Sequence, residues 1–272
     1  MNKRGFGFLW FAINTENTNY AKLSIKLAGS IKALGMLGET AVACDSETRK
    51  LLCNNKDIDH LIQIPDFISS DGAQNFLNEW QAFRLTPFTH TIKLESDMLF
   101  TSNISWWWHV LKQHDMVFSH DCFDIAENKV VDQKHRRIFI QNHLPNIYNG
   151  LTYFRYCEYA NSFFNLCKAL TENWKSVREH ILINCHDTNP STDIIYALAK
   201  KILDPLQIKT IRYDFFRMIH FKPHISRDSH HAIMEKYMPL LDNKKIILGG
   251  QALTKPFHYH DKDFFDKVNY VQ

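Results

Sequence analysis

The sequence predicts an α/β fold, in which helices flank a central β-sheet. Through the first half of the chain, apolar runs of strand length alternate with segments whose apolar residues recur at helical spacing. The chain has 272 residues, of which 45% are hydrophobic, and this is enough to bury one large core. No Gly/Ser/Pro-rich linker and no internal repeat divides it. We therefore expect a single domain.

The first elements follow the strand, loop, helix, strand order of a nucleotide-binding half. They are a strand at 5–13, a polar loop at 14–19, a helix at 20–34 and strands at 40–44 and 61–64. Leu23, Leu27 and Ile31 place one apolar face on the helix. The loop lacks the G-x-G-x-x-G pattern, which argues against a dinucleotide cofactor. The sequence also has no G-x-x-x-x-G-K-[ST] phosphate loop.

The remaining elements are assigned by the same periodicities. Phe76, Trp80 and Phe83 indicate a helix that Pro87 ends, because proline cannot continue a helix. The elements expected after it are a strand from 90, a helix at 103–111, a strand at 115–119, a strand at 148–155, a helix at 158–172 and a helix beginning near 190. The long polar stretch at 123–141 between two of these strands is typical of a lid or substrate loop.

Two carboxylates end the apolar run that begins at His90. Glu95 and Asp97 do not suit a strand interior, so we expect them where a buried strand leaves its sheet. Alternate residues of an extended segment point the same way, so both could face one hard cation, which prefers oxygen ligands. Acid pairs at this spacing are also common on solvated turns. The pair alone therefore leaves both interpretations open.

The block around these acids, NEWQAFRLTPFTHTIKLESDMLFTSNISWWW, resembles the helix, strand and acidic turn of nucleotide-sugar-dependent glycosyltransferases of the GT-A type. Their acidic turn is a DxD motif, and here its first acid is Glu95 rather than Asp. The resemblance implies a single GT-A (Rossmann-like) domain with a mixed central sheet flanked by helices and a C-terminal extension. It further implies a nucleotide-binding half at 5–100, an acceptor and sugar half at 101–204, an extension at 205–272 that returns to the metal site, and Mn²⁺ or Mg²⁺ as cofactor.

The same resemblance assigns donor-binding residues. Ala12, Asn14 and Thr15 would lie near the nucleotide base, Arg84 would meet the diphosphate, and Ser96 belongs to the acidic turn with Glu95 and Asp97. Ordinary loop and helix-cap chemistry explains the first three equally well. A solvated helix charge is the alternative for Arg84.

Three further segments complete the implied site. The phrase YNGLTYFR resembles a family strand that lines the sugar pocket, which selects Asn149 and Gly150, although an Asn-Gly turn is also ordinary hairpin chemistry. Asp193 would contact the transferred sugar, as a hydroxyl acceptor or as a general base if the reaction inverts. First-turn helix physics alone would also place an acid there. In the C-terminal phrase KPFHYHD, His258 or His260 would complete the metal coordination, with His258 favoured.

The acceptor remains open at the level of sequence. The chain resembles bacteriophage enzymes that glycosylate modified DNA bases, and also surface-polysaccharide enzymes; a UDP-sugar is the expected donor. For DNA, Arg136 and Arg137 would contact phosphates, within a basic set that also contains Lys134, His135, Lys222, His224 and Arg227. A solvated charged loop is the alternative for this set. A sugar-nucleotide nucleotidyltransferase and a noncatalytic binding module are the competing functions.

Charge and cysteine usage give the expected location. The formal charge is only +3, from 32 basic and 29 acidic residues, which neither requires nor opposes a polyanionic partner. The six cysteines show no metal-finger or redox spacing, and no apolar run approaches the length of a membrane span. We expect free cysteines, no membrane span and a cytoplasmic location, which would be the bacterial host cytoplasm for a phage protein. The oligomeric state is not predicted.

Overall fold

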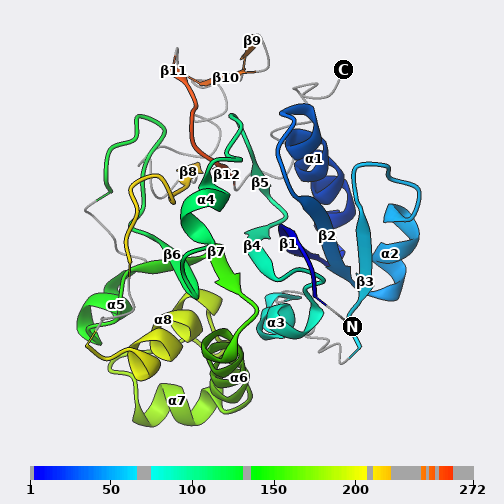
Figure 1. Ribbon diagram of the computed structural model, residues 1–272. Coiled ribbons are helices and arrows are strands. Elements are labelled where there is room, and N and C mark those ends of the chain that lie inside the picture. Colours follow the sequence, from blue (N-terminus) through cyan, green and yellow to red (C-terminus); the bar gives the residue numbers. More distant parts are fainter. Residues whose placement is uncertain are drawn as a thin grey trace.

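The central feature of the structure is a six-stranded sheet with the order β3-β2-β1-β4-β7-β6 (Figure 1). The strands are β1 (Phe6–Ala12), β2 (Glu39–Cys44), β3 (His60–Gln63), β4 (His90–Glu95), β6 (Met116–His120) and β7 (Ile147–Arg155). This computed structural model describes residues 3–65, 75–130, 136–206, 211–221, 240–242, 245–248 and 251–259.

The sheet is mixed, and its strand order creates a ligand-binding position. β1, β2, β3 and β4 are parallel, whereas β7 runs antiparallel to both β4 and β6. The chain leaves β1 toward β2 and β3 and then returns to β4 on the other side of β1. Ligands of open α/β sheets bind beyond the carboxyl ends of the strands at such a switch point. The site is therefore expected between the segments that follow β1 and β4.

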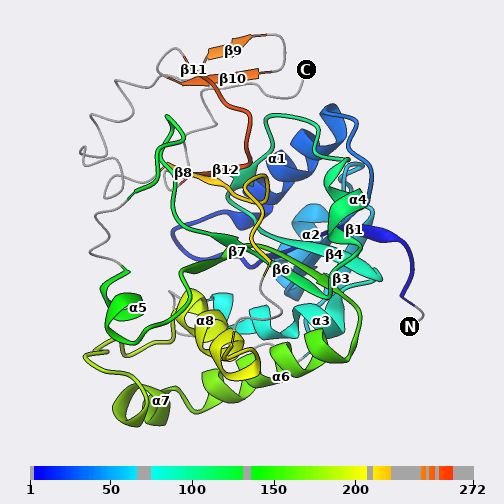
Figure 2. The ribbon, with the colours of Figure 1, turned by 60° about the vertical axis from the view of Figure 1, so that its left-hand side comes forward.

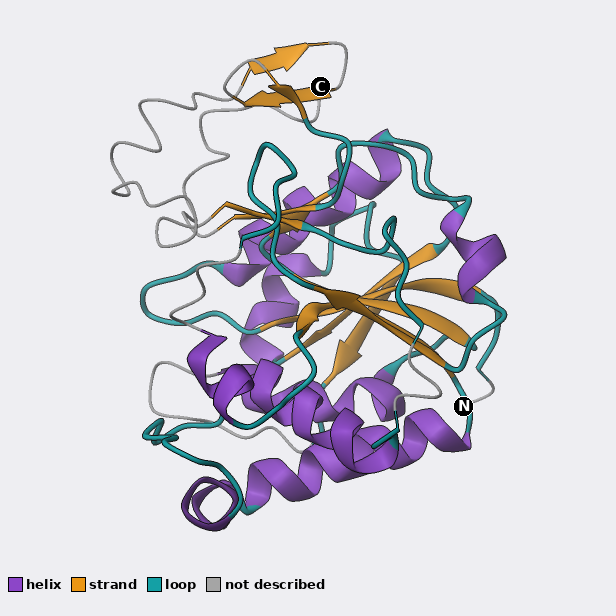
Figure 3. Ribbon diagram, turned by 90° about the vertical axis from the view of Figure 1, so that its left-hand side faces the viewer, coloured by secondary structure: helices purple, strands orange, loops and turns teal. Residues whose placement is uncertain are grey.

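Alternate residues of β1 contribute to different cores, as the period of two in a strand requires. Leu9 and Phe11 belong to one apolar cluster, and Phe8 and Trp10 to the other. The first cluster is covered by α3 (Ala82–Leu85), α6 (Glu158–Glu172), α7 (Trp174–His180) and α8 (Thr192–Leu203). The second is covered by α1 (Tyr20–Ala33), α2 (Ser46–Leu52) and α4 (Trp107–Leu111). Figures 2 and 3 show the sheet between these two groups of helices.

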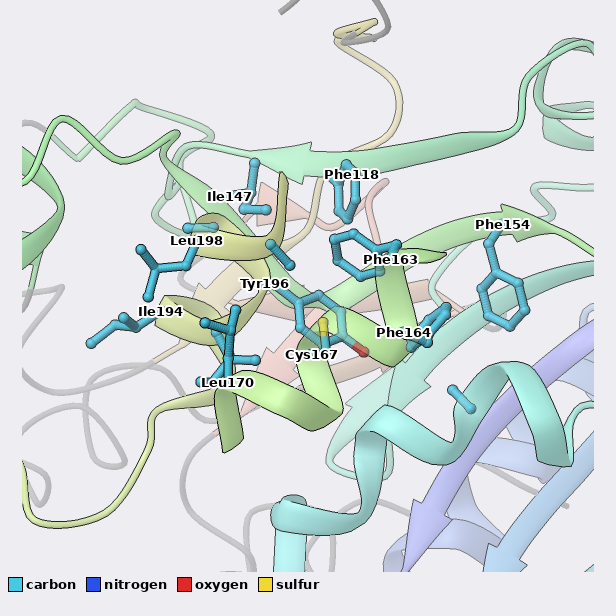
Figure 4. Packing of buried hydrophobic residues seen from close by; sticks show 14 of the residues in the cluster. Phe118, Ile147, Phe154, Phe163, Phe164, Cys167, Leu170, Ile194, Tyr196 and Leu198 are labelled. Carbon is cyan, nitrogen blue, oxygen red and sulfur yellow. The ribbon is translucent and has the colours of Figure 1, made fainter. Parts of the chain in front are cut away.

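Aromatic packing fixes α6 and α8 against each other and against the sheet (Figure 4). The rings of Phe163 on α6 and Tyr196 on α8 meet edge to face, with centroids 5.1 Å apart. Phe163 also contacts Phe118 of β6, at 5.2 Å between centroids. Such pairs add roughly 0.5–1.5 kcal/mol to the burial of the rings. This packing holds the amino end of α8, and with it Asp193, at a defined position.

A second sheet returns the C-terminal part of the chain to the turn after β4. It consists of β5 (Met98–Leu99), β12 (Phe257–Tyr259) and β8 (Ile219–Phe221), and β12 lies between the other two. The backbone strands β9 (Leu240–Asp242), β10 (Lys245–Leu248) and β11 (Gln251–Ala252) form a third sheet.

The predicted α/β class with a mixed sheet is confirmed. The differences lie in short helices and in the two small sheets, whose strands of two to four residues were not predicted from the sequence. The helix expected at 76–83 is a 3₁₀ helix, η1 (Asn75–Gln81), followed by α3. The helix expected from 103 begins at Trp107. The sequence did not predict α2, α5 (Arg137–Gln141) or α7, since five to seven residues carry too little periodic signal. α5 occupies part of the expected loop at 123–141.

The expectation of free cysteines agrees with the structure. All six cysteines are free. Among the described residues, no helix is both long and apolar enough to cross a membrane.

His120 at the end of β6 should make folding stability depend on pH. Burial, with help from Arg212 and Lys200, lowers the pKa of His120 from 6.5 to about 4. Between these values the unfolded chain binds a proton that the folded chain does not, so stability should fall as pH falls through this window. The loss attributable to this one imidazole is up to about 3 kcal/mol. Urea unfolding at pH 7 and pH 4.5 should show a smaller difference for His120→Gln than for wild type; equal differences would contradict the assignment.

Candidate active site

Two carboxylates and one imidazole converge where β4 ends. Glu95 is the last residue of β4, Asp97 lies in the turn that follows, and His258 lies on β12 opposite Met98 of β5. His258 Nε2 is 2.9 Å from Glu95 Oε2 and 3.2 Å from Asp97 Oδ2. The backbone N–H of Tyr259 donates to the carbonyl of Asp97 at 3.1 Å, which ties β12 to the acidic turn. Residues far apart in the sequence thus form one cluster.

This cluster has the composition of a divalent-cation site. One ligand atom from each of Glu95, Asp97 and His258 lies within 4.8 Å of the other two. Asp97 and His258 are buried, and Glu95 is partly exposed. Two acids held this close in a partly buried position repel each other unless a cation is shared between them. Carboxylate oxygens with one imidazole suit Mn²⁺ or Mg²⁺. The residues therefore fit the expected metal.

Gly150 allows β7 to approach this cluster closely. A Cβ atom added at Gly150 would lie 2.9 Å from Glu95 Oε2 and 3.1 Å from Met218 Cε. Any side chain larger than hydrogen would push the Glu95 carboxylate from its place. Gly150 lies within β7 rather than in a hairpin turn, so the feature that requires glycine is this close approach to Glu95.

The variant Gly150→Ala should weaken metal binding. The added methyl group would displace the Glu95 carboxylate by a few tenths of an ångström, and we expect about a tenfold loss of Mn²⁺ affinity, comparable to the loss of a supporting contact in other metal sites. Calorimetric titration of Mn²⁺ in the presence of a nucleoside diphosphate measures this. Ser105→Ala, at a position that does not line the cleft described below, is the control. Unchanged affinity in Gly150→Ala would show that Glu95 does not bind the ion.

Asp193 in the first turn of α8 faces the sheet and does not cap its own helix in the described contacts. Its Oδ1 accepts the backbone N–H of Asn149 at 2.7 Å, and its Oδ2 accepts from Arg136 Nη2 at 2.8 Å. Arg136 is buried, with its guanidinium 3.5 Å from the Tyr148 ring centroid and 4.3 Å from that of Phe139. The carboxylate is therefore oriented from two sides.

Beneath Asn149 lies a buried pair of opposite charges that the sequence analysis missed. Lys93 Nζ of β4 is 2.5 Å from Glu79 Oε2 of η1. The Asn149 side-chain amide donates to the same Glu79 oxygen at 2.8 Å, and Lys93 donates to the Asn149 carbonyl at 3.2 Å. Burial raises the pKa of Glu79 above its ordinary value, and the Lys93 ammonium opposes that shift. The available signal was the lysine inside an apolar strand, since a buried lysine requires a partner.

An open cleft of about 400 Å³ joins these groups. Its lining is mainly polar and consists of Glu95, Asn149, Asp187, Thr188, Asn189, Pro190, Ser191, Thr192 and Asp193. Hydroxyl, amide and carboxylate groups of this kind can hydrogen-bond a polyhydroxylated ligand. Glu95 of the metal cluster and Asp193 therefore line one cleft, and the loop before α8 forms one of its walls.

The residues expected near the donor base lie at the switch point. Phe11 of β1 pairs with Glu95, so Ala12, which ends β1, and Asn14 and Thr15, which follow it, lie beside the acidic turn. Asn14 Oδ1 accepts from the N–H of Ala21 in α1 at 2.9 Å, and its own N–H donates to Thr48 at 3.0 Å. Ser96 is buried within the turn. These hydrogen bonds are the loop and cap contacts that the sequence allowed for Asn14. A residue that makes such contacts can also border the donor base.

Arg84 does not lie near the cluster. Its carbonyl and that of Thr86 accept from Lys3, which precedes β1, so Arg84 lies at the amino ends of β1 and β4, whereas the metal cluster lies at the carboxyl ends. The side chain is exposed and bonds to Gln81. The expected contact with the donor diphosphate is not supported, because the helix before β4 ends at the amino ends of the strands, opposite the carboxyl ends where the cluster lies.

The two arginines expected on a DNA surface have different environments. Arg136 is buried and paired with Asp193, so its guanidinium does not face solvent as a phosphate contact would require. Arg137 is exposed at the start of α5. The other members of the basic set, Lys134, His135, Lys222, His224 and Arg227, and also His260, lie outside the described residues.

Comparison with solved structures extends over nearly the whole chain. The match to galactosyltransferase LgtC in complex with donor and acceptor sugar analogs has 11% sequence identity and a TM-score of 0.58, and covers 97% of this chain and 93% of that one. An active-site mutant of LgtC matches at 12% identity and TM-score 0.58, covering 98% and 96%. Apo mouse xyloside xylosyltransferase 1 matches at 8% identity and TM-score 0.55, covering 93% and 96%.

Sequence comparison adds no relative. No family model and no curated protein matches the chain. At 8–12% identity the structural matches establish the fold. The polypeptide has the α/β fold of the GT-A glycosyltransferases.

Proposed function

We propose that this protein is a metal-dependent glycosyltransferase that moves a sugar from a nucleotide-sugar to an acceptor hydroxyl. The observation that carries this proposal is the convergence of Glu95, Asp97 and His258 at the switch point of a GT-A-like sheet, beside a polar cleft. A bound Mn²⁺ or Mg²⁺ would neutralise the nucleoside diphosphate leaving group. A pyrophosphorylase-type nucleotidyltransferase would need a Gly-rich basic loop after β1, and residues 12–19 contain no glycine.

The chain's own residues divide the remaining tasks. Glu95, Asp97 and His258 hold the cation, and the segment Ala12–Thr15 borders the nucleotide. In this proposal residues 5–100 form the nucleotide-binding half, 101–204 the sugar and acceptor half, and 205–272 the extension that supplies His258.

On the sugar side of the cleft, Asn149, Gly150 and Asp193 position the donor sugar. Asp193 already accepts two hydrogen bonds, from Asn149 and Arg136. These two bonds fix the orientation of the carboxylate at the wall of the cleft, where its remaining lone pairs can accept a sugar hydroxyl. We propose the role of hydroxyl acceptor for it.

The acceptor that fits the described cleft best is a saccharide. One matched enzyme, LgtC, was solved with donor and acceptor sugar analogs, and its name identifies it as a galactosyltransferase. The DNA hypothesis placed Arg136 and Arg137 within a larger basic set, and the burial of Arg136 against Asp193 removes that residue as a phosphate contact. A UDP-sugar remains the donor to test first.

A donor screen tests the proposal. The purified chain would be incubated with UDP-, GDP-, dTDP- and CMP-sugars, Mn²⁺ or Mg²⁺ and a panel of mono- and disaccharide acceptors, and release of the nucleotide would be scored. We expect release with one nucleotide class, dependent on the metal and increased by an acceptor. Hydroxymethylated duplex DNA in the same panel separates the two acceptor classes. No release from any donor, together with no binding of any Mn²⁺–nucleotide, would overturn the proposal.

A further inference from the structure

The segment of β7 that borders the cleft has few backbone pairing partners in its own sheet. Pairing with β4 extends from Arg155 only to Leu151, opposite Leu94. On the other edge the register with β6 shifts, so that Tyr148 pairs with Ser119 but the next paired residue is Thr152. Asn149 and Gly150 thus lie beyond the end of the ladder with β4 and within the irregularity of the ladder with β6. Irregularities of this kind re-aim side chains near active sites.

Side chains replace the missing ladder at Asn149. Lys93 donates to its carbonyl, Glu79 accepts from its side-chain amide, and Asp193 accepts its backbone N–H. Three polar groups of one residue are therefore fixed by three other elements, β4, η1 and α8. Of these partners, only Asp193 lines the cleft; Lys93 and Glu79 lie below it.

The Lys93–Glu79 pair is an inefficient way to stabilise a core. The side chain of Lys93 is fully buried and that of Glu79 is 9% exposed. Transfer of two charges out of water is unfavourable, and apolar residues of similar volume often stabilise a core as well or better. The ring of Tyr196 lies over Lys93, at 5.5 Å from Nζ to the centroid, and adds to the enclosure of the pair. Unlike apolar side chains, the charged pair forms hydrogen bonds with Asn149 and so fixes its orientation.

We propose that Lys93 and Glu79 are positioning residues for the cleft: their ion pair fixes Asn149, and through the Asn149 N–H it fixes the Asp193 carboxylate in the geometry needed for sugar transfer. This inference rests on the proposed glycosyltransferase function for its catalytic consequence. The positional consequence is independent of that function. No described hydrogen bond or ion pair joins either residue to the metal cluster, and the charge of Glu79 acts on Glu95 only through space. Nucleotide binding through the metal should therefore change little.

The test replaces the pair by apolar side chains, in the variant Lys93→Met/Glu79→Leu. We expect kcat to fall about 100-fold, since small displacements of positioned groups cost that much. The Kd for Mn²⁺ with nucleoside diphosphate should stay within about threefold. Amide hydrogen exchange at Asn149, followed by NMR on ¹⁵N-labelled protein, should accelerate about 100-fold while amides of β1 are unchanged. The second variant, Lys93→Met/Glu79→Gln, restores an acceptor to the Asn149 amide and should recover part of both losses.

Lys200→Met is the matched control, since Lys200 is a buried lysine on α8 that makes no described contact with Asn149. It should leave kcat and Asn149 exchange at wild-type values. If the pair has only a structural role, kcat and the exchange rate of the Asn149 amide stay at wild-type values in any double variant that folds. That result would overturn the inference, and so would failure of both double variants to fold. If wild type transfers no sugar from any donor, the proposed function fails, and the exchange measurement still decides whether the pair positions Asn149.

Discussion

Replacing Asp97 with alanine is expected to lower the rate of sugar transfer about 1,000-fold or more, because the acidic turn would lose a carboxylate that we propose as a ligand of the cation. Asp97 is buried and its Oδ2 lies 3.2 Å from His258 Nε2. Glu95 and His258 alone would offer the ion two protein ligands in place of three. Binding of the metal with nucleotide should therefore be lost along with turnover.

Stability should change much less than activity. In the absence of metal, Asp97 and Glu95 are two acids beside one imidazole, so removal of one acid also removes repulsion. We expect the free energy of unfolding to change by about 1 kcal/mol or less. Calorimetry with Mn²⁺ and nucleoside diphosphate, nucleotide release and thermal unfolding measure the three quantities.

Asp115→Ala is the control for the removal of a carboxylate. Asp115 forms an ion pair with Arg155 at the surface, where β6 begins, and its loss should leave transfer and metal binding intact. Undiminished turnover by the wild-type protein in excess chelator would refute the metal-dependent mechanism, whatever Asp97→Ala does.

The variant Asp193→Asn is expected to lower kcat/KM about 100-fold or more, because the asparagine cannot present the same charge to a sugar hydroxyl. Its amide has one acceptor oxygen in place of two, so its NH2 group would face a donor, either Arg136 Nη2 or the Asn149 N–H, both of which now donate to Asp193. Since Arg136 is only 2% exposed, loss of its counter-ion should destabilise the fold by about 1–3 kcal/mol. This exceeds the roughly 0.3–1 kcal/mol expected for a first-turn acid alone.

Rate and stability can be separated by a control in the same helix. Asp204 is buried at the C-terminal end of α8, so Asp204→Asn should cost stability without slowing transfer. Both variants would be assayed at a temperature well below their unfolding midpoints. If Asp193→Asn keeps near-normal kcat/KM there, the carboxylate has a structural role only.

The sequence by itself determined the order of the elements and the identity of the acidic turn. Strand and helix periodicities are local properties, so β1, α1, β4, α6 and α8 could be read from short windows. The switch from an apolar strand to Glu95 and Asp97 is equally local, and it marked the carboxyl end of β4 correctly. The phrase around His258 pointed to the third member of the metal cluster because of its resemblance to a known family phrase.

Only the tertiary structure decided which distant groups meet. The sequence alone does not distinguish Arg84 from Arg136, since both are basic residues. In the structure Arg84 precedes β4 and lies at the amino ends of the strands, away from the metal cluster, whereas the Arg136 guanidinium pairs with the Asp193 carboxylate. Lys93 and Glu79 belong to different elements, and their partnership with Asn149 depends on the shift in register between β6 and β7. Such contacts depend on strand order, register and helix packing, which are set by the burial of the whole chain and leave no periodic signal in the segments that they join.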